Sequence, residues 1–358
     1  MTEIPLFTTV NLLTGFLGSG KTTLLKRLLN DPALADAAVL INEFGETGLD
    51  HHLVERIDEN MVLLQSGCVC CTVRGELAEA IRDLLSKRDR GIVPPFKRLV
   101  IESTGLADPF PVLSTLKADP VLRHHFKAGN VITTVDAVNG ARSLDTYLES
   151  NRQIAVADRL VITKSDLVDE ATMDGLIERI TRINPDCVVL DVHDEALSVA
   201  DLLDSGDFVR GEHVQSATGF YCEDSRDLLD SKGAPHSAEF RSFSITVDRP
   251  VDWTAFGIWL TMLINRHGER VLRVKGILDI AGEDRPVAIH GVQHLVHTPV
   301  HMQAWTTEER QSRIVFIVDG LDPKLLRRSF EAFALVDRVP VQPATVVAQR
   351  ENAMTVEH

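Results

Sequence analysis

The segment GFLGSGKT at residues 15–22 constrains the fold of this chain more than any other feature. It fits the pattern G-x-x-x-x-G-K-[ST], follows an apolar run at residues 10–13 and precedes a leucine-rich run at residues 24–29. Glycines let the backbone turn so that consecutive N–H groups point inward, and the N-terminus of a following helix adds partial positive charge. The segment therefore predicts a strand, a phosphate-binding loop (P-loop) and a helix in direct succession.

The P-loop pattern assigns roles to individual residues. The Lys21 ammonium group is expected to reach the β- and γ-phosphates of a nucleotide and is counted as catalytic, and the Thr22 hydroxyl is expected to bind Mg²⁺. The alternative is a chance glycine-rich turn, against which the flanking strand and helix argue. The residues expected in the phosphate site are Gly15, Gly18, Ser19, Gly20, Lys21, Thr22 and Thr23.

Strand-like and helical patterns alternate up to about residue 205. Such alternation predicts a mostly parallel sheet with helices on both faces and with ligands at the carboxyl ends of its strands. We therefore expect an α/β P-loop NTPase domain over residues 1–205. The strand-like runs are residues 10–13, 39–42, 61–64, 99–101, 131–135, 160–163 and 187–190.

The rest of the chain has a different pattern. Residues 206–238 are rich in Ser, Gly, Asp and charge without a clear period, which predicts a linker. A smaller α+β domain with one antiparallel sheet is expected over residues 239–340, followed by a frayed tail at residues 341–358. Its strands are expected near residues 243–247, 272–280 and 314–318, and its helices at residues 253–264, mainly as core, and 324–333.

Composition argues against two classes of partner. The formal net charge of −15 leaves no basic surplus to neutralise the phosphates of a nucleic acid. No apolar run approaches the ~18 residues that a membrane span needs, and the N-terminus lacks the basic start and apolar core of a signal peptide. We expect a cytoplasmic protein, without nucleic-acid or membrane partners, whose five cysteines are reduced.

The sequence VITKSD at residues 161–166 ends a strand-like run with T-K-x-D. One carboxylate, that of Asp166, can accept from both the N1–H and the amino group of guanine, whereas adenine lacks this donor pair. The stem of Lys164 can lie over the base plane. GTPases usually carry Asn in place of Thr163, and Asn offers both a donor and an acceptor. The alternative is a strand that merely ends in a polar turn.

The sequence VIESTG at residues 100–105 is a second candidate for the phosphate side. Glu102 ends an apolar run and is expected to hold Mg²⁺ directly or through water. The Gly105 N–H is expected to contact a γ-phosphate. A plain acidic residue at a strand end is the alternative, and Asp136, which ends another strand-like run, fits a turn cap.

Cys68, Cys70 and Cys71 lie in the sequence GCVCC, just before a predicted helix. Thiols at a helix N-terminus ionise readily, and thiolates this dense can ligate Zn²⁺ or a similar ion. A redox pair or buried thiols are the alternatives. One loop cannot close a tetrahedral site, which suits a metal that is handed over. The candidates that could complete the site are Glu43, Glu46, His51 and His52.

Four histidines at residues 290, 294, 297 and 301 also suggest a metal site by their spacing. On one continuous strand, however, the first two would face the opposite side from the last two. We therefore expect His290, His294, His297 and His301 to form no shared site.

Taken together, these motifs make the chain resemble the CobW-like GTPases, which are related to the UreG and HypB maturation factors of metal enzymes. The resemblance covers nearly the whole length and is most specific where GCVCC lies between the P-loop and E-S-T-G. It implies a P-loop GTPase domain joined to a CobW C-terminal domain, with GTP and Mg²⁺ binding and slow hydrolysis. It also implies zinc, or another transition metal such as cobalt, at the CxCC motif. The shared segments are residues 15–25, 41–50, 67–71, 100–109, 161–167, 273–278 and 290–297.

Two departures from the family pattern affect these expectations. Some relatives carry a His-rich tract in the linker, which this chain lacks. Some also have Glu where this chain has Ile41, which shifts weight to Glu46 and the cysteines as metal ligands.

The function expected from the residues and the resemblance is a GTP-driven metallochaperone. GTP would order residues 43–50 so that they complete a metal site with the cysteine loop, and hydrolysis would release the metal to a client metalloprotein. Glu43 and Glu46 are candidates for positioning the attacking water. A metal sensor that never transfers its metal and a P-loop phosphotransferase are the alternatives. The sequence leaves open the client, the metal and a homodimer.

Overall fold

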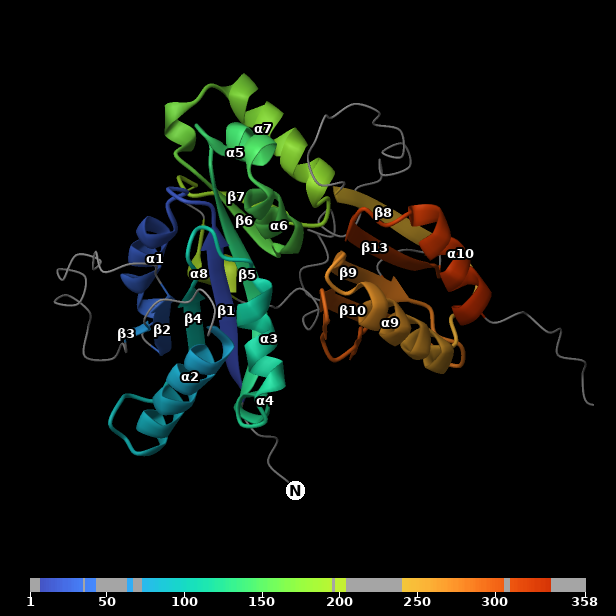
Figure 1. Ribbon diagram of the computed structural model, residues 1–358, viewed down its shortest axis with the longest axis horizontal. Helices are drawn as coiled ribbons and strands as arrows, with labels where there is room; N and C mark the ends of the chain where they lie inside the picture. Colours follow the sequence, from blue (N-terminus) through green and yellow to red (C-terminus); the bar gives the residue numbers. More distant parts are fainter. Residues whose placement is uncertain are drawn as a thin grey trace, which may run out of the picture.

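The computed structural model describes residues 7–34, 36–42, 63–66, 73–194, 197–203, 240–305 and 310–335. These residues form two β-sheets with their helices, an N-terminal α/β domain and a smaller C-terminal domain (Figure 1). The expected domain limits fall among residues outside this part, so they stay predictions. None of the helices described is both long and apolar enough to cross a membrane.

The N-terminal sheet has seven strands in the order β3-β2-β4-β1-β5-β6-β7. Every neighbouring pair is parallel. Each strand overlaps one of the expected runs, so the predicted α/β P-loop NTPase fold is confirmed. The strands are β1 (Thr8–Gly15), β2 (Ala37–Asn42), β3 (Leu63–Ser66), β4 (Arg98–Glu102), β5 (Phe126–Asp136), β6 (Arg159–Thr163) and β7 (Val188–Asp191).

Successive residues of the central strands are buried on opposite faces of this sheet. Leu12 and Ile101 pack in one apolar cluster with α2, whereas Leu13 and Val100 pack in another with α1. A strand buried on both faces reads as a continuous apolar run, which is the pattern seen in the sequence. The helices of this domain are α1 (Lys21–Leu29), α2 (Val73–Asp89), α3 (Phe110–Ala118), α4 (Leu122–His125), α5 (Gly140–Thr146), α6 (Leu148–Val156), α7 (Glu170–Ile183) and α8 (Val199–Leu203).

The C-terminal domain is built on an antiparallel sheet in the order β11-β10-β9-β13-β8, with β12 paired to β10. Its two helices pack together and cover one face of the sheet (Figure 1). The predicted α+β architecture is confirmed. The elements are β8 (Phe240–Val247), α9 (Trp253–His267), β9 (Val271–Leu278), β10 (Val287–Val292), β11 (Leu295–Val296), β12 (Val300–His301), β13 (Ser312–Asp319) and α10 (Pro323–Ala334).

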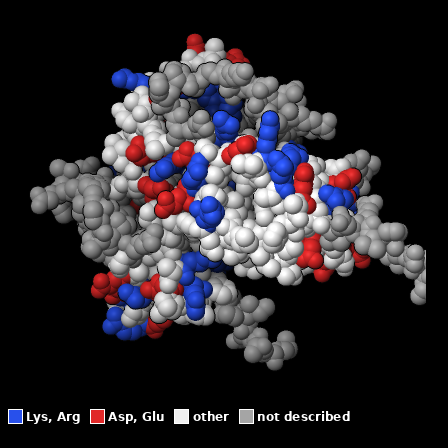
Figure 2. All heavy atoms as spheres, turned by 45° about the vertical axis from the view of Figure 1, so that its right-hand side comes forward, with Lys and Arg blue, Asp and Glu red and all other residues white. Residues whose placement is uncertain are grey.

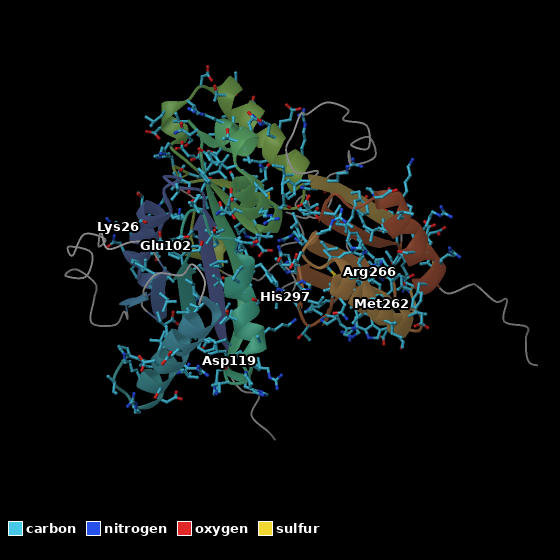
Figure 3. The ribbon with its side chains drawn as sticks, viewed as in Figure 1. Lys26, Glu102, Asp119, Met262, Arg266 and His297 are labelled. Carbon is cyan, nitrogen blue, oxygen red and sulfur yellow. The ribbon has the colours of Figure 1, made fainter. Side chains whose placement is uncertain are left out.

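Helix α9 has one buried side and one exposed side, although its sequence is broadly apolar. Phe256 and Trp259 are buried in the domain core, whereas Ile258 and Met262 are exposed. The helix begins where the Asp252 carboxylate accepts a 2.8 Å hydrogen bond from the Ala255 N–H, an ordinary N-cap. Met262 and Arg266 are labelled on this helix in Figure 3.

The expectation that His290 and His297 face opposite sides is wrong. The rings of His290 and His297 stack with centroids 4.5 Å apart. The segment is not one continuous strand, because the chain turns at Gln293, with φ of 50°, and β11 pairs back onto β10. The alternation of faces along one strand does not apply across such a turn.

A buried ion pair joins the two domains. Arg273 on β9 is 1% exposed, and its guanidinium contacts the Asp158 carboxylate at 2.6 Å and donates to the Val156 carbonyl at 2.8 Å. Burial acts to raise the pKa of Asp158, but the Arg273 charge holds it well below its usual range. Asp158 also accepts from the Val131 N–H at 2.8 Å, so the pair is tied directly to β5.

Apolar contacts accompany this ion pair. Val292 and Leu295 of the β10–β11 hairpin are buried in the same cluster as helices α2 and α3 of the N-terminal domain. Ala155 of α6 packs with Leu272 and Ile317 of the C-terminal sheet. The two domains are therefore joined by apolar contacts together with a buried ion pair.

Figure 2 shows basic and acidic side chains interspersed over one face of the molecule, beside a broad area that carries neither.

Candidate functional site

The P-loop joins β1 to α1, and glycines at positive φ shape it. Gly15, Gly18 and Gly20 have φ angles of 141°, 72° and 88°, which side chains rarely adopt. A Cβ atom at Gly15 would also lie 2.3 Å from the Oγ1 atom of Thr134. The same Thr134 Oγ1 atom forms a 2.6 Å hydrogen bond with the Ser19 Oγ atom. The loop therefore has the curved backbone that suits a phosphate.

Lys21 is the first residue of α1, and its side chain folds back over the P-loop. Its Nζ atom donates to the carbonyls of Gly15 at 2.8 Å and Phe16 at 3.0 Å. The side chain is buried. The ammonium group thus lies against the loop backbone.

Thr22 and Glu102 come together although 80 residues separate them in the sequence. The Thr22 hydroxyl donates to the Glu102 Oε1 atom at 2.8 Å, which joins α1 to the carboxyl end of β4; Figure 3 labels Glu102 there. Hydroxyl and carboxylate oxygens are the ligands that Mg²⁺ prefers. The pair therefore fits the expected magnesium ion. Thr23, the next residue of the helix, is exposed.

Gly105 lies directly against the P-loop. A Cβ atom at this position would lie 2.7 Å from the backbone nitrogen of Leu17, so only glycine allows the approach. The loop after β4 is further fixed where the Ser103 hydroxyl donates to the Thr14 Oγ1 atom at 2.8 Å. The structure thus brings the E-S-T-G segment and the P-loop into contact.

Thr163 ties the T-K-x-D segment to the P-loop. Its hydroxyl donates to the Ser19 carbonyl at 2.8 Å, and a Cβ atom at Gly20 would lie 3.2 Å from its methyl group. Thr163 therefore contacts the P-loop through both its hydroxyl and its methyl group.

Lys164 is held over the P-loop by two acceptors. It has a left-handed φ of 57°, and its Nζ atom donates to the Gly18 carbonyl at 3.0 Å and to the Asp136 Oδ2 atom at 2.7 Å. Asp136 also accepts from the N–H groups of Val138 and Asn139. Burial acts to raise its pKa, but these hydrogen bonds hold it below the usual value. Asp136 therefore caps a turn, as its position suggested, and in addition anchors Lys164.

Asp166 is half-exposed and has a partner that the sequence motif does not include. The His193 Nε2 atom lies 2.8 Å from the Asp166 Oδ1 atom. His193 follows β7, the strand next to β6, so both residues lie at the carboxyl edge of the sheet. Its place after an expected strand is the sequence signal that could have identified it.

The predicted metal ligands lie outside the described residues: Glu43, Glu46, Cys68, Cys70 and Cys71. The strands that lead into their two segments are described, and Asn42 at the end of β2 pairs with Ser66 at the end of β3. Both segments therefore start from adjacent strand ends, at the carboxyl ends of the strands, where the P-loop also lies. Within the part of the chain that the structure describes, no group of three or more His, Cys, Asp or Glu side chains could hold a metal ion.

A cavity of about 380 Å³ adjoins the P-loop on the side of α5 and α6. Its lining includes Leu17, Arg142, Tyr147 and Gln153. The lining also includes Gly18, Ser19 and Lys164, so the cavity borders the residues expected to bind nucleotide.

Two protein-family models match the chain. The nucleotide-binding domain of the CobW/HypB/UreG family matches residues 9–191, and the C-terminal domain of the cobalamin synthesis protein CobW matches residues 240–334. Together they cover both domains of the structure.

Several known proteins are similar over most of their length. The zinc chaperone YjiA of Escherichia coli is 34% identical over 321 residues, which cover 90% of this chain and 97% of that protein. The zinc chaperone CobW of a Sinorhizobium species is 25% identical, with 89% and 95% covered. The crystal structure of Zn(II)-bound YjiA GTPase has a TM-score of 0.67 at 29% identity and covers 91% of this chain and 99% of its own. The chain therefore belongs to the CobW/HypB/UreG family, with a CobW-type C-terminal domain.

Proposed function

We propose that this protein couples the binding and hydrolysis of GTP to the handling of zinc, which it delivers to a client protein. The chain is a P-loop GTPase of the CobW family. Relatives that carry the names zinc chaperone and zinc-regulated GTPase metalloprotein activator support zinc as the metal. Delivery to a client, and pairing with a second copy of the chain, rest on the sequence analysis.

The observation that carries the proposal is the shared edge of the sheet. The carboxyl ends of β2 and β3 pair at Asn42 and Ser66, and β2 is followed in the sheet by β4 and β1, which end at Glu102 and the P-loop. The segments with Glu43 and Glu46 and with the cysteines therefore begin beside the phosphate residues. Contacts of one segment with a γ-phosphate would change the geometry of a metal site shared by both.

The described residues divide the chemistry of the nucleotide between them. Lys21 would balance charge on the β- and γ-phosphates, Gly105 would donate its N–H to the γ-phosphate, and Asp166 would accept from guanine while Lys164 covers the base. Thr22 and Glu102 would hold Mg²⁺, which neutralises phosphate charge when bound. We assign Glu43 or Glu46 to the attacking water.

Zinc is the cargo in this scheme. Cys68, Cys70, Cys71 and Glu46 would bind it while GTP is present and release it after hydrolysis. Coupling between two sites is reciprocal, so zinc must also raise the affinity for GTP.

The test is a comparison of zinc affinity with two nucleotides, by competition with a chromophoric chelator. We expect tighter binding with Mg²⁺ and a non-hydrolysable GTP analogue than with Mg²⁺ and GDP, by about 5–150-fold, the usual range of such coupling. Equal affinities would contradict the proposal. Labelled zinc that stays bound through GTP turnover in the presence of clients would instead favour a metal sensor.

Two cysteine variants make this test specific. Cys70→Ala should lose tight zinc binding and keep GTP affinity in metal-free buffer. Cys187→Ala is the matched control, since Cys187 is buried and burial raises the pKa of its thiol to about 12, which makes it a poor ligand. It should bind zinc like the wild type.

Asp166→Asn should reduce the preference for guanine nucleotides. The variant loses the charged acceptor for the guanine donors, and such hydrogen bonds contribute about 1.5–3 kcal/mol each. We expect GDP affinity to fall at least tenfold in fluorescence titrations. Asp169→Asn, three residues further along, is the control, because Asp169 caps α7 and Asn is also a good cap. Equal losses in both variants would refute the assignment of Asp166 to the base.

A further inference from the structure

Gln153 of α6 contacts the loop that carries Gly105, yet it belongs to none of the nucleotide motifs. Its Nε2 atom donates to the carbonyl of Gly105 at 3.1 Å and to that of Ala107 at 3.2 Å. The side chain is 1% exposed. Both neighbours are acceptors, so only the amide nitrogen can face them, which fixes the orientation of the side chain.

The backbone of α6 is held in place at Gln153. The Thr133 hydroxyl on β5 donates to the main-chain carbonyl of Gln153 at 2.9 Å, which ties this turn of α6 to the sheet. On its other side, Gly105 lies against the Leu17 backbone, where even a Cβ atom would approach to 2.7 Å. The Gly105 loop is therefore confined between the P-loop and Gln153.

From this geometry we infer that Gln153 is a positioning residue for the γ-phosphate: it holds the Gly105 loop in the form that contacts GTP but not GDP. The inference rests on the proposed function, because it assumes that the P-loop binds guanine nucleotides. A loop that is already in place loses less conformational freedom when the γ-phosphate binds. GDP has no γ-phosphate for the loop to contact, so we expect its affinity to depend on this loop less than that of GTP.

The test compares Gln153→Met with Asn151→Leu. Met has about the length of Gln but cannot donate to the two carbonyls. Asn151 is a matched control on the same helix, 8% exposed, whose Nδ2 atom donates to the carbonyls of Leu144 at 2.7 Å and Tyr147 at 3.0 Å. The Asn151→Leu substitution thus also removes a buried amide that donates to two carbonyls, but these carbonyls lie outside the Gly105 loop.

The readout is the ratio of the dissociation constants of a non-hydrolysable GTP analogue and GDP, both with Mg²⁺. We expect Gln153→Met to weaken the GTP analogue about tenfold relative to GDP, from the loss of two hydrogen bonds. Asn151→Leu should lower thermal stability to a similar degree and leave the ratio unchanged. A general loosening of the domain would change the ratio of dissociation constants alike in both variants. Positioning of the loop by Gln153 would change it only in Gln153→Met.

The other outcomes decide against the inference. A folded Gln153→Met variant with the wild-type ratio would overturn it, and so would equal changes of the ratio in both variants. If Gln153→Met does not fold, Gln153→Asn keeps the amide but shortens it by one methylene, and the same criteria apply. A wild-type protein that binds neither nucleotide would overturn the proposed function itself, a result distinguishable from an unchanged ratio.

Discussion

Lys21→Ala should abolish measurable nucleotide binding and hydrolysis. Lys21 is the first residue of α1, and its ammonium group donates hydrogen bonds to the P-loop carbonyls of Gly15 and Phe16. Removing it takes away the positive charge nearest the phosphates and also loosens the loop. Charge-assisted hydrogen bonds contribute about 1.5–3 kcal/mol each, so the loss of two or more corresponds to at least about 100-fold in affinity.

The measurement is titration with a fluorescent GDP analogue, followed by phosphate release from GTP. Lys26→Ala is the matched control, because Lys26 lies on the same helix and is exposed (Figure 3). We expect its affinity to stay within about twofold of the wild type, as for most surface substitutions. Normal turnover by Lys21→Ala would remove the basis for the P-loop assignment.

Arg273→Met should destabilise the protein more than any other substitution considered. It removes one partner of a buried ion pair and leaves the Asp158 carboxylate buried without its counter-charge, a change that costs about 3–5 kcal/mol. Urea denaturation followed by tryptophan fluorescence reports the effect, because Trp253, Trp259 and Trp305 all lie in the C-terminal domain. Arg266→Met on α9, where the side chain is exposed, should change stability by less than about 0.5 kcal/mol.

A second substitution separates the charge pair from packing. Asp158→Asn combined with Arg273→Met should recover part of the lost stability, because no unpaired charge is then buried. If the double variant is as unstable as the sum of the single ones, the ion pair is not the cause of the loss.

The Asp158–Arg273 ion pair should also make the stability of the protein depend on pH in the acid range. The folded pKa of Asp158 lies below its usual value, so the unfolded chain takes up this proton first as the pH falls. The stability from Asp158 is therefore complete above the ordinary carboxyl pKa of about 4 and declines below it. Arg273→Met should lose stability less steeply over that acid range.

The sequence predicts the parts of the site whose geometry is local. The local sequence of residues 15–22 is enough to predict a P-loop, because the glycines and the following helix together shape it. Glu102 could be identified because it ends a strand, and Asp166 because it follows one by three residues; the carboxyl ends of parallel strands meet at one edge. The topology then brings Thr22 to Glu102 across 80 residues of sequence.

The remaining contacts depend on distances that no local pattern reveals. Gln153 reaches Gly105 from a helix 48 residues later, and its neighbours on α6 give no reason to single it out. Asp136 was recognisable as a turn cap, but its pairing with Lys164 requires β5 and β6 to be neighbours in register. The expected alternation of the histidine faces failed for a related reason, since the turn at Gln293 is not marked by a glycine.

The contact between the domains limits how such chains can exchange parts during evolution. A foreign C-terminal domain would need an arginine opposite Asp158 and apolar residues in place of Val292 and Leu295, which complete a cluster of the GTPase domain. Without these residues, the GTPase domain that receives the foreign domain would carry an unpaired buried carboxylate and an exposed apolar surface. The two halves are therefore expected to be inherited together, and chimaeras between relatives should fold only when both sides of this contact are transferred.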